Sequence, residues 1–144
     1  MSNPEERADD REEYQQLEVD FMEDLDLPEI YVEKANIFTE LWSWIEKNIY
    51  RINVLKGWTQ KERTDGEMIA LIHAEISEAL EGLRHGNQRS KIIPEVSEAE
   101  EEIADALIRI MDMAFLRKWN IPKALFLKLE YNKTRPYRHG GKLF

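Results

Sequence analysis

The sequence predicts an all-α protein with a four-helix-bundle-like architecture. Beyond about residue 31, large apolar residues recur at steps of three and four, the spacing that places them on one face of an α-helix. Two segments, 64–67 and 97–100, carry the Thr/Ser-x-x-Glu pattern that caps the start of a helix. No segment alternates apolar and polar residues over the length of a half-buried strand. Helices are therefore expected throughout the folded part of the chain.

The first helix is predicted over about residues 32–52 and the second from its Thr64 cap to Arg84. Gly86 is placed to close the second helix, because glycine adopts the left-handed conformation that commonly follows a last helical turn. Lys56-Gly57-Trp58 and the polar residues after it connect the two. The first helix owes its prediction to apolar residues at helical spacing, namely Ile37, Phe38, Leu41, Trp42, Ile45, Ile49 and Ile52.

A third helix is predicted from Ser97 to about Lys118, and a fourth from Asn120-Ile-Pro122 to about Thr134. Apolar residues cover most of the circumference of the third helix, which predicts a central place in the assembly. Its polar residues form one stripe, made of Glu102, Asp105, Arg109 and Asp112. Arg109 and Asp112 could pair with each other or support a site beside them, and the sequence leaves both possibilities open.

Charge divides the chain of 144 residues into an acidic arm over residues 1–30 and a folded domain over residues 31–144. The arm holds twelve acidic residues and two basic ones, a net of −10, and is expected to be mobile apart from a possible short helix ending at Pro28. Residues 117–144 hold eight basic residues and one acidic residue, a net of +7. An acidic body argues against general binding of nucleic acids, and allows a small anionic substrate.

Cysteine is absent, which excludes disulfides and thiolate metal sites. The acidic N-terminus is unlike a secretory signal, and no apolar stretch approaches the roughly 20 residues that a bilayer requires. A cytoplasmic protein without membrane partners is expected.

Two carboxylate pairs lie on the second and third predicted helices: Glu75 with Glu78, and Glu102 with Asp105. Residues three apart share one helix face, and both pairs lie in strongly apolar helices, where an isolated ionised carboxylate is costly to bury. Four converging carboxylates would repel one another, and a divalent cation removes that conflict. Oxygen ligands without cysteine favour Mg²⁺, with Mn²⁺ as a possible substitute, over zinc.

With 23 residues between them, the two pairs resemble the signature of the MazG-type all-α nucleoside triphosphate pyrophosphohydrolases. Segments 71–80 (LIHAEISEAL) and 102–112 (EIADALIRIMD) are similar to that family, as is the C-terminal segment with Lys128, Asn132-Lys133, Arg135-Pro136 and His139-Gly-Gly-Lys142. The resemblance covers about residues 35–144 and leaves out the acidic arm. It implies the helical architecture of that family, completed by oligomerisation.

The resemblance implies Mg²⁺-dependent hydrolysis of a nucleoside triphosphate, in particular a deoxynucleotide, to the monophosphate and pyrophosphate. Such a reaction cleans the nucleotide pool. The metal ligands and catalytic residues would be Glu75, Glu78, Glu102 and Asp105. Basic and amide side chains of the last helix and tail would help to hold the phosphates, namely Asn132, Lys133 and Arg135. Family members also assemble as dimers or dimers of dimers, with active sites near the subunit boundary, so a homo-oligomer is expected.

The loop after the first helix supplies two further candidates. Lys56 and Trp58 could close over a substrate, with Trp58 stacking on a base, although a loop tryptophan can also cap the core. Lys133 and Arg135 have a second interpretation as well, as cations that offset a helix C-terminus.

Three other functions compete with the pyrophosphohydrolase. A non-catalytic helical module that binds nucleotides or a protein could retain the same ligands, and turnover would distinguish it. A phosphoribosyl-ATP pyrophosphohydrolase would resemble the same architecture. A di-iron carboxylate bundle uses Glu-x-x-His pairs. The residues three before His73, His85 and His139 are Ala70, Gly82 and Pro136, so the sequence contains no such pair, which argues against this function.

Overall fold

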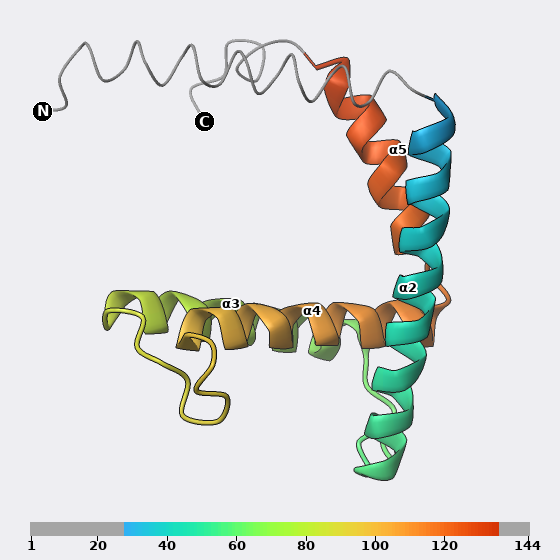
Figure 1. Ribbon diagram of the computed structural model, residues 1–144. Coiled ribbons are helices and arrows are strands. Elements are labelled where there is room, and N and C mark those ends of the chain that lie inside the picture. The colour runs from blue at the N-terminus through green and yellow to red at the C-terminus, as the bar shows by residue number, and fades with distance from the viewer. Residues whose placement is uncertain (1–27, 136–144) are drawn as a thin grey trace, which may run out of the picture. The chain divides into compact units, whose positions relative to one another are not determined.

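The computed structural model describes residues 28–135, and over this range it is all-helical (Figure 1). The helices are α2 (Pro28–Leu55), α3 (Asp65–Arg84), α4 (Glu98–Arg117) and α5 (Ile121–Lys133), which confirms four helices and no strand within the described residues. Residues 1–27 of the expected arm and the tail beyond Arg135 lie outside the described residues, and residues 28–30 belong to α2. The chain divides after Thr39 into two compact units, and every residue discussed below as part of a site belongs to the second.

Helix α2 is longer than the sequence predicted at both ends. It begins at Pro28, which was expected to end a preceding helix; proline suits a first helical position, since its fixed φ is helical and its missing N–H would have no partner there. The helix ends at Leu55 because Gly57, with φ of +76°, turns the chain. The N–H of Gly57 donates to Val54 and that of Trp58 to Asn53, the paired bonds of a glycine-terminated helix.

Both predicted capping boxes are present at the starts of α3 and α4. Thr64 and Ser97 each accept a hydrogen bond from the backbone N–H of the glutamate three residues later, and that glutamate accepts from the cap in return. These bonds lower the pKa of Glu67 and Glu100, because the cap's donors stabilise the charged carboxylate. The predicted boundaries of α3 and α4 are therefore confirmed.

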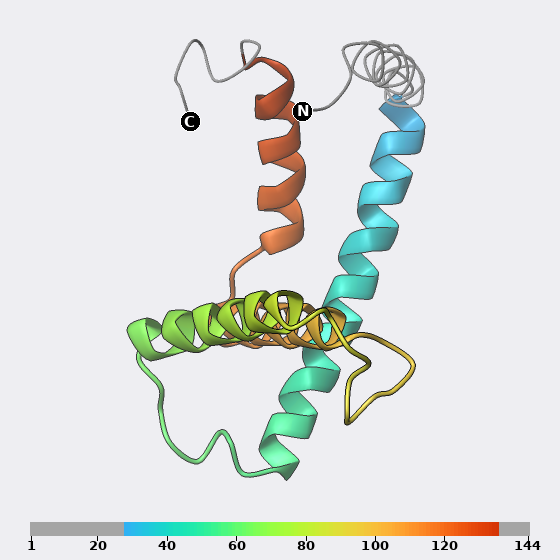
Figure 2. The same cartoon turned by 90° about the vertical axis from the view of Figure 1, so that its left-hand side faces the viewer.

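Helices α3 and α4 run antiparallel and side by side as a hairpin (Figures 1 and 2). At one end, Nε of Arg117 lies 2.5 Å from Oδ1 of Asp65. At the other end the helices approach closely at Gly82, where an added Cβ would lie 3.2 Å from Cβ of Glu98. The hairpin thus places the middle of α3 against the first half of α4.

The second half of α2 joins the hairpin through a buried carboxylate. Asp112 is 3% exposed, and accepts hydrogen bonds from Nδ2 of Asn53 at 2.7 Å and Nη2 of Arg63 at 2.6 Å. The rings of Tyr50 and Phe115 pack beside this group, with centroids 4.7 Å apart. Asp112 therefore pairs with Arg63 and not with Arg109, which answers one question that the sequence left open.

Buried apolar residues are few, and most of them are small or flexible: Trp42, Ile49, Met68, Ala79, Ala99, Ala106, Met113 and Ala114. The expected central place of α4 is confirmed for one face only. Its other apolar face, with Ile103, Leu107 and Ile108, is between 43% and 49% exposed in a single chain. Among the described helices, none combines the length and apolar character that crossing a bilayer demands.

Candidate metal centre

Helices α3 and α4 bring three carboxylates together. Oxygen atoms of Glu75, Glu78 and Glu102 all lie within 4.8 Å of one another. Glu75 is buried, Glu102 is half-buried and Glu78 is exposed, so the group opens from the interior of the hairpin toward solvent. The three side chains could hold a metal ion, because their oxygens converge from two helices with fixed separation.

The surroundings of Glu102 disfavour its charged form. Burial, the nearby charge of Glu78, and a hydrogen bond and further charge from Glu75 raise the pKa of Glu102 to about 7. A carboxyl with such a pKa is partly protonated near neutral pH, since the ionised form is repelled by its neighbours. A divalent cation would reverse this balance and favour the ionised form.

Asp105, the fourth predicted ligand, stands outside the group of three. Burial raises its pKa, with smaller contributions from the negative charges of Glu75 and Glu101, while Arg109 lowers it. Asp105 is therefore close enough to Glu75 to interact with it, although its oxygens do not join the cluster formed by Glu75, Glu78 and Glu102.

Arg109 provides the cluster with one cation from the protein itself. Its Nε lies 2.5 Å from Oε1 of Glu75, whose side chain is 8% exposed. This pair offsets the charge of the most buried carboxylate and directs one of its oxygens toward α4. The sequence left the role of Arg109 open, and the structure assigns it to the support of Glu75.

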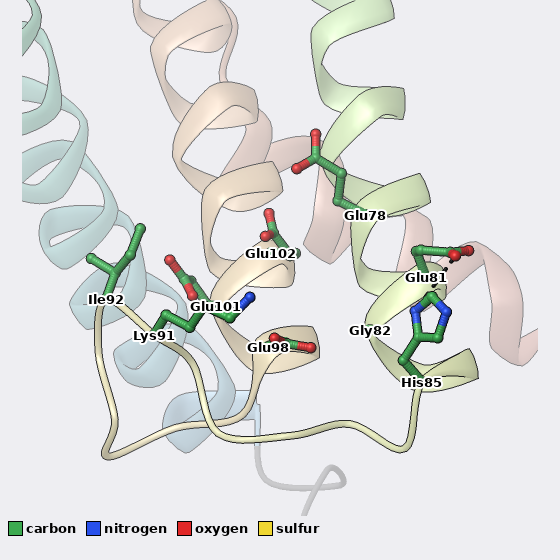
Figure 3. Close-up of a pocket in the computed structure, with 9 residues that line it drawn as sticks. All are labelled: Glu78, Glu81, Gly82, His85, Lys91, Ile92, Glu98, Glu101 and Glu102. Atoms are coloured by element: carbon green, nitrogen blue, oxygen red, sulfur yellow. Dashed lines mark ion pairs between the residues drawn. The ribbon is translucent and has the colours of Figure 1, made fainter.

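A cavity of about 360 Å³ adjoins the cluster at the end of the hairpin where the helices are linked (Figure 3). Glu78 and Glu102 line it, and the loop between α3 and α4 borders it. His85 lies beside Glu81 at its edge, with Nδ1 3.5 Å from Oε1. The remaining lining residues are Gly82, Lys91, Ile92, Glu98 and Glu101.

The five predicted substrate-binding residues are not among those that line this cavity. Lys56 and Trp58 follow the last turn of α2, and Trp58 is 62% exposed, so it does not cap the core of a single chain.

Asn132, Lys133 and Arg135 lie at the exposed end of α5. Nζ of Lys133 is 3.0 Å from Oε1 of Glu130. One chain therefore brings together three of the four predicted metal ligands, and the predicted phosphate ligands do not line the cavity beside them.

Sequence reasoning missed the partners of the buried carboxylates. Asn53 and Arg63 are 59 and 49 residues from Asp112, and no local pattern connects them. Arg109 carried a weak signal, since it belongs to the charged stripe of α4 one turn beyond Asp105. No protein-family model, curated protein or solved structure matches this chain.

Proposed function

We propose that the protein is a divalent-metal-dependent nucleoside triphosphate pyrophosphohydrolase of the MazG type, which releases a monophosphate and pyrophosphate. The observation that carries the proposal is the convergence of Glu75, Glu78 and Glu102, with a raised pKa at Glu102 and a cavity lined by Glu78 and Glu102. The residue pattern in both carboxylate pairs and in the C-terminal segment adds the family and the substrate class. A deoxynucleoside triphosphate is the expected substrate.

The residues present fit a resident Mg²⁺ or Mn²⁺. The donor set is all oxygen, and its mutual repulsion is relieved only by a cation or a proton. Glu75, Glu78 and Glu102 would hold the metal, with Asp105 beside them. When bound, the metal would offset the charge of the phosphate oxygens and make a water molecule easier to deprotonate.

Asp105 is the carboxylate best suited to accept the proton from the attacking water. It lies outside the group of three, so its oxygens are less committed to a cation. Its raised pKa makes it a stronger base than an ordinary aspartate. Arg109 would hold the side chain of Glu75 in place through their ion pair.

We also propose that the active unit is a homo-oligomer, either a dimer or a dimer of dimers. The apolar faces of both hairpin helices remain open in one chain, with Ile76 45%, Leu80 57% and Leu107 49% exposed. A second copy packed on the hairpin would bury these residues. It would also offer a route for the end of α5, with Asn132, Lys133 and Arg135, to reach a neighbour's phosphates. Light scattering at micromolar concentration tests the assembly, and an active monomer would contradict it.

The reaction is tested with a panel of nucleoside and deoxynucleoside triphosphates in Mg²⁺ and in Mn²⁺. Pyrophosphate and a monophosphate are the expected products, and EDTA should abolish their release. Release of orthophosphate and a diphosphate would contradict the proposed bond cleavage. Binding of metal and nucleotide without any turnover would instead identify a binding module.

A further inference from the structure

The loop between α3 and α4 is held in shape by a buried serine. Ser90 is 2% exposed, and its Oγ accepts hydrogen bonds from the N–H groups of Ile92 at 3.0 Å and Ile93 at 2.8 Å. Its own N–H donates to the carbonyl of Val96 at 3.0 Å. A loop fixed by this many bonds to one buried residue presents the side chains at its tip in a defined direction.

Lys91 is one of the side chains that this loop presents, and it lines the cavity beside the carboxylate cluster (Figure 3). Among the described residues that line the cavity, it is the one lysine or arginine. It forms no ion pair with any residue in the described part of the chain. By contrast, Glu81 in the same cavity is paired with Arg84, whose Nη1 lies 3.8 Å from Oε2 of Glu81. A cation without an ion-pair partner therefore lines the same cavity as two carboxylates of the cluster, Glu78 and Glu102.

We propose that Lys91 is a substrate-binding residue. It pairs with those phosphate oxygens whose negative charge the metal does not offset. This inference rests on the proposed function, and adds a residue that neither the charged motifs nor the C-terminal segment indicated. The size of the cavity, about 360 Å³, falls within the range of small-molecule sites.

The charges around the cavity explain why such a cation is needed. Glu98 and Glu101 line the cavity in addition to the proposed ligands Glu78 and Glu102. A triphosphate that enters this space would be repelled by Glu98 and Glu101, because the metal on the other carboxylates does not screen them fully. Lys91 lines the same cavity as these glutamates and offsets that repulsion. Lysine suits this role, since a flexible point charge can follow a phosphate chain as it moves.

The test compares Lys91→Ala and Lys91→Arg with wild-type protein in steady-state hydrolysis with Mg²⁺. The control is Lys47→Ala, an exposed lysine of α2 that does not line the cavity. Lys91→Ala should raise KM about tenfold, the scale of one partly solvated hydrogen bond to a charged group. The turnover number should change less than about twofold, because the contact is made equally in the ground state and the transition state. Lys91→Arg should recover most of the loss, and Lys47→Ala should match wild type.

A second measurement separates substrate binding from support of the metal centre. Mn²⁺ titrated without nucleotide should bind Lys91→Ala at least as tightly as wild type, because the substitution removes a nearby positive charge. Weaker Mn²⁺ binding, an unchanged KM, or no recovery in Lys91→Arg would overturn the assignment. A wild-type protein that hydrolyses no triphosphate would overturn the proposed function and this inference together. An active wild type with an unaffected Lys91→Ala would overturn this inference alone.

Discussion

Two regions of α4 differ in how the negative charge of their carboxylates is offset by neighbouring groups. Asp112, near the end of α4, accepts hydrogen bonds from Asn53 and Arg63 and is buried with its counter-ion in place. Glu102, ten residues earlier, faces Glu75 and Glu78, and its pKa rises to about 7. A carboxylate that holds the fold together carries its partners within the chain. An external cation is expected instead at a carboxylate that lacks such partners and lies within a group of converging oxygens.

The largest expected effect, on turnover, comes from removing the charge of a carboxylate in the cluster or beside it. Glu78→Gln should lower turnover by about 100-fold or more, because it removes one charge from the proposed metal site. Asp105→Asn should lower it by about 100-fold or more as well, because it removes the proposed general base beside that site. In EDTA both variants should be as stable as wild type or slightly more stable, because they relieve repulsion among like charges. Hydrolysis rates and melting temperatures measure the two effects. A variant that melts far below wild type in EDTA would identify a structural carboxylate, and Glu40→Gln on α2 is the control.

Removing the charge of Asp112, whose partners lie within the chain, should instead lower the stability of the fold. Asp112→Ala leaves the donors of Asn53 and Arg63 without their acceptor, and should lower the free energy of unfolding by about 3 kcal/mol, with or without Mg²⁺. Urea unfolding measures this loss. The control is Asp65→Ala, which breaks the more exposed pair with Arg117 and should cost less than about 1 kcal/mol. Equal losses for the two variants would remove the contrast between buried and exposed pairs.

The pH dependence of stability should also distinguish the regions. The folded pKa of Glu102 lies above its ordinary value of 4.5, so its contribution to stability is fully present below about pH 4.5 and is lost as the pH rises through about 7. Metal-free protein should therefore become less stable between pH 5 and pH 8 through this group. Saturating Mg²⁺ should reduce or reverse that loss. Thermal unfolding of wild type and Glu102→Gln across this range is the measurement, and equal slopes in EDTA would contradict it.

The smallest effect is expected from a neighbour that only adds to the repulsion. Glu101 contributes the last of the causes that raise the pKa of Glu102. Glu101→Gln should therefore lower that pKa slightly, without changing the fold. An NMR titration of the Glu102 side-chain carboxyl carbon in metal-free protein follows the change directly. A rise in the pKa would mean that Glu101 acts on Glu102 other than through its charge.

Local signals in the sequence predicted most of the helix boundaries. Thr64, Ser97 and Gly86 act within a few residues of themselves, so their patterns identify where helices begin and end. Pro28 misled the prediction, because a proline that ends one helix and a proline that begins another look alike in sequence.

The site was predicted only in part, since its geometry depends on how two helices are rotated. Spacing placed Glu75 and Glu78 on one face, and Glu102 and Asp105 on another. Spacing could not show that the oxygens of Glu102 converge with those of Glu75 and Glu78, whereas those of Asp105 do not. Arg109 forms a hydrogen bond with Glu75, which lies 34 residues earlier in the chain. This contact depends on how the two helices pack and not on any local pattern.

Helices α3 and α4 approach closely at Gly82, beside the carboxylate cluster. Gly82 lies one turn beyond Glu78, and Glu98 lies one turn before Glu102, so this contact is next to the carboxylates along both helices. A methyl group at residue 82 would lie 3.2 Å from Cβ of Glu98, so Glu98 would have to shift by a few tenths of an ångström. Mg²⁺ prefers oxygens at about 2.0–2.1 Å and Ca²⁺ at about 2.3–2.6 Å, a difference of the same size. In the proposed metal site, the missing side chain at Gly82 would therefore influence how closely the oxygens of Glu78 and Glu102 can approach a shared cation.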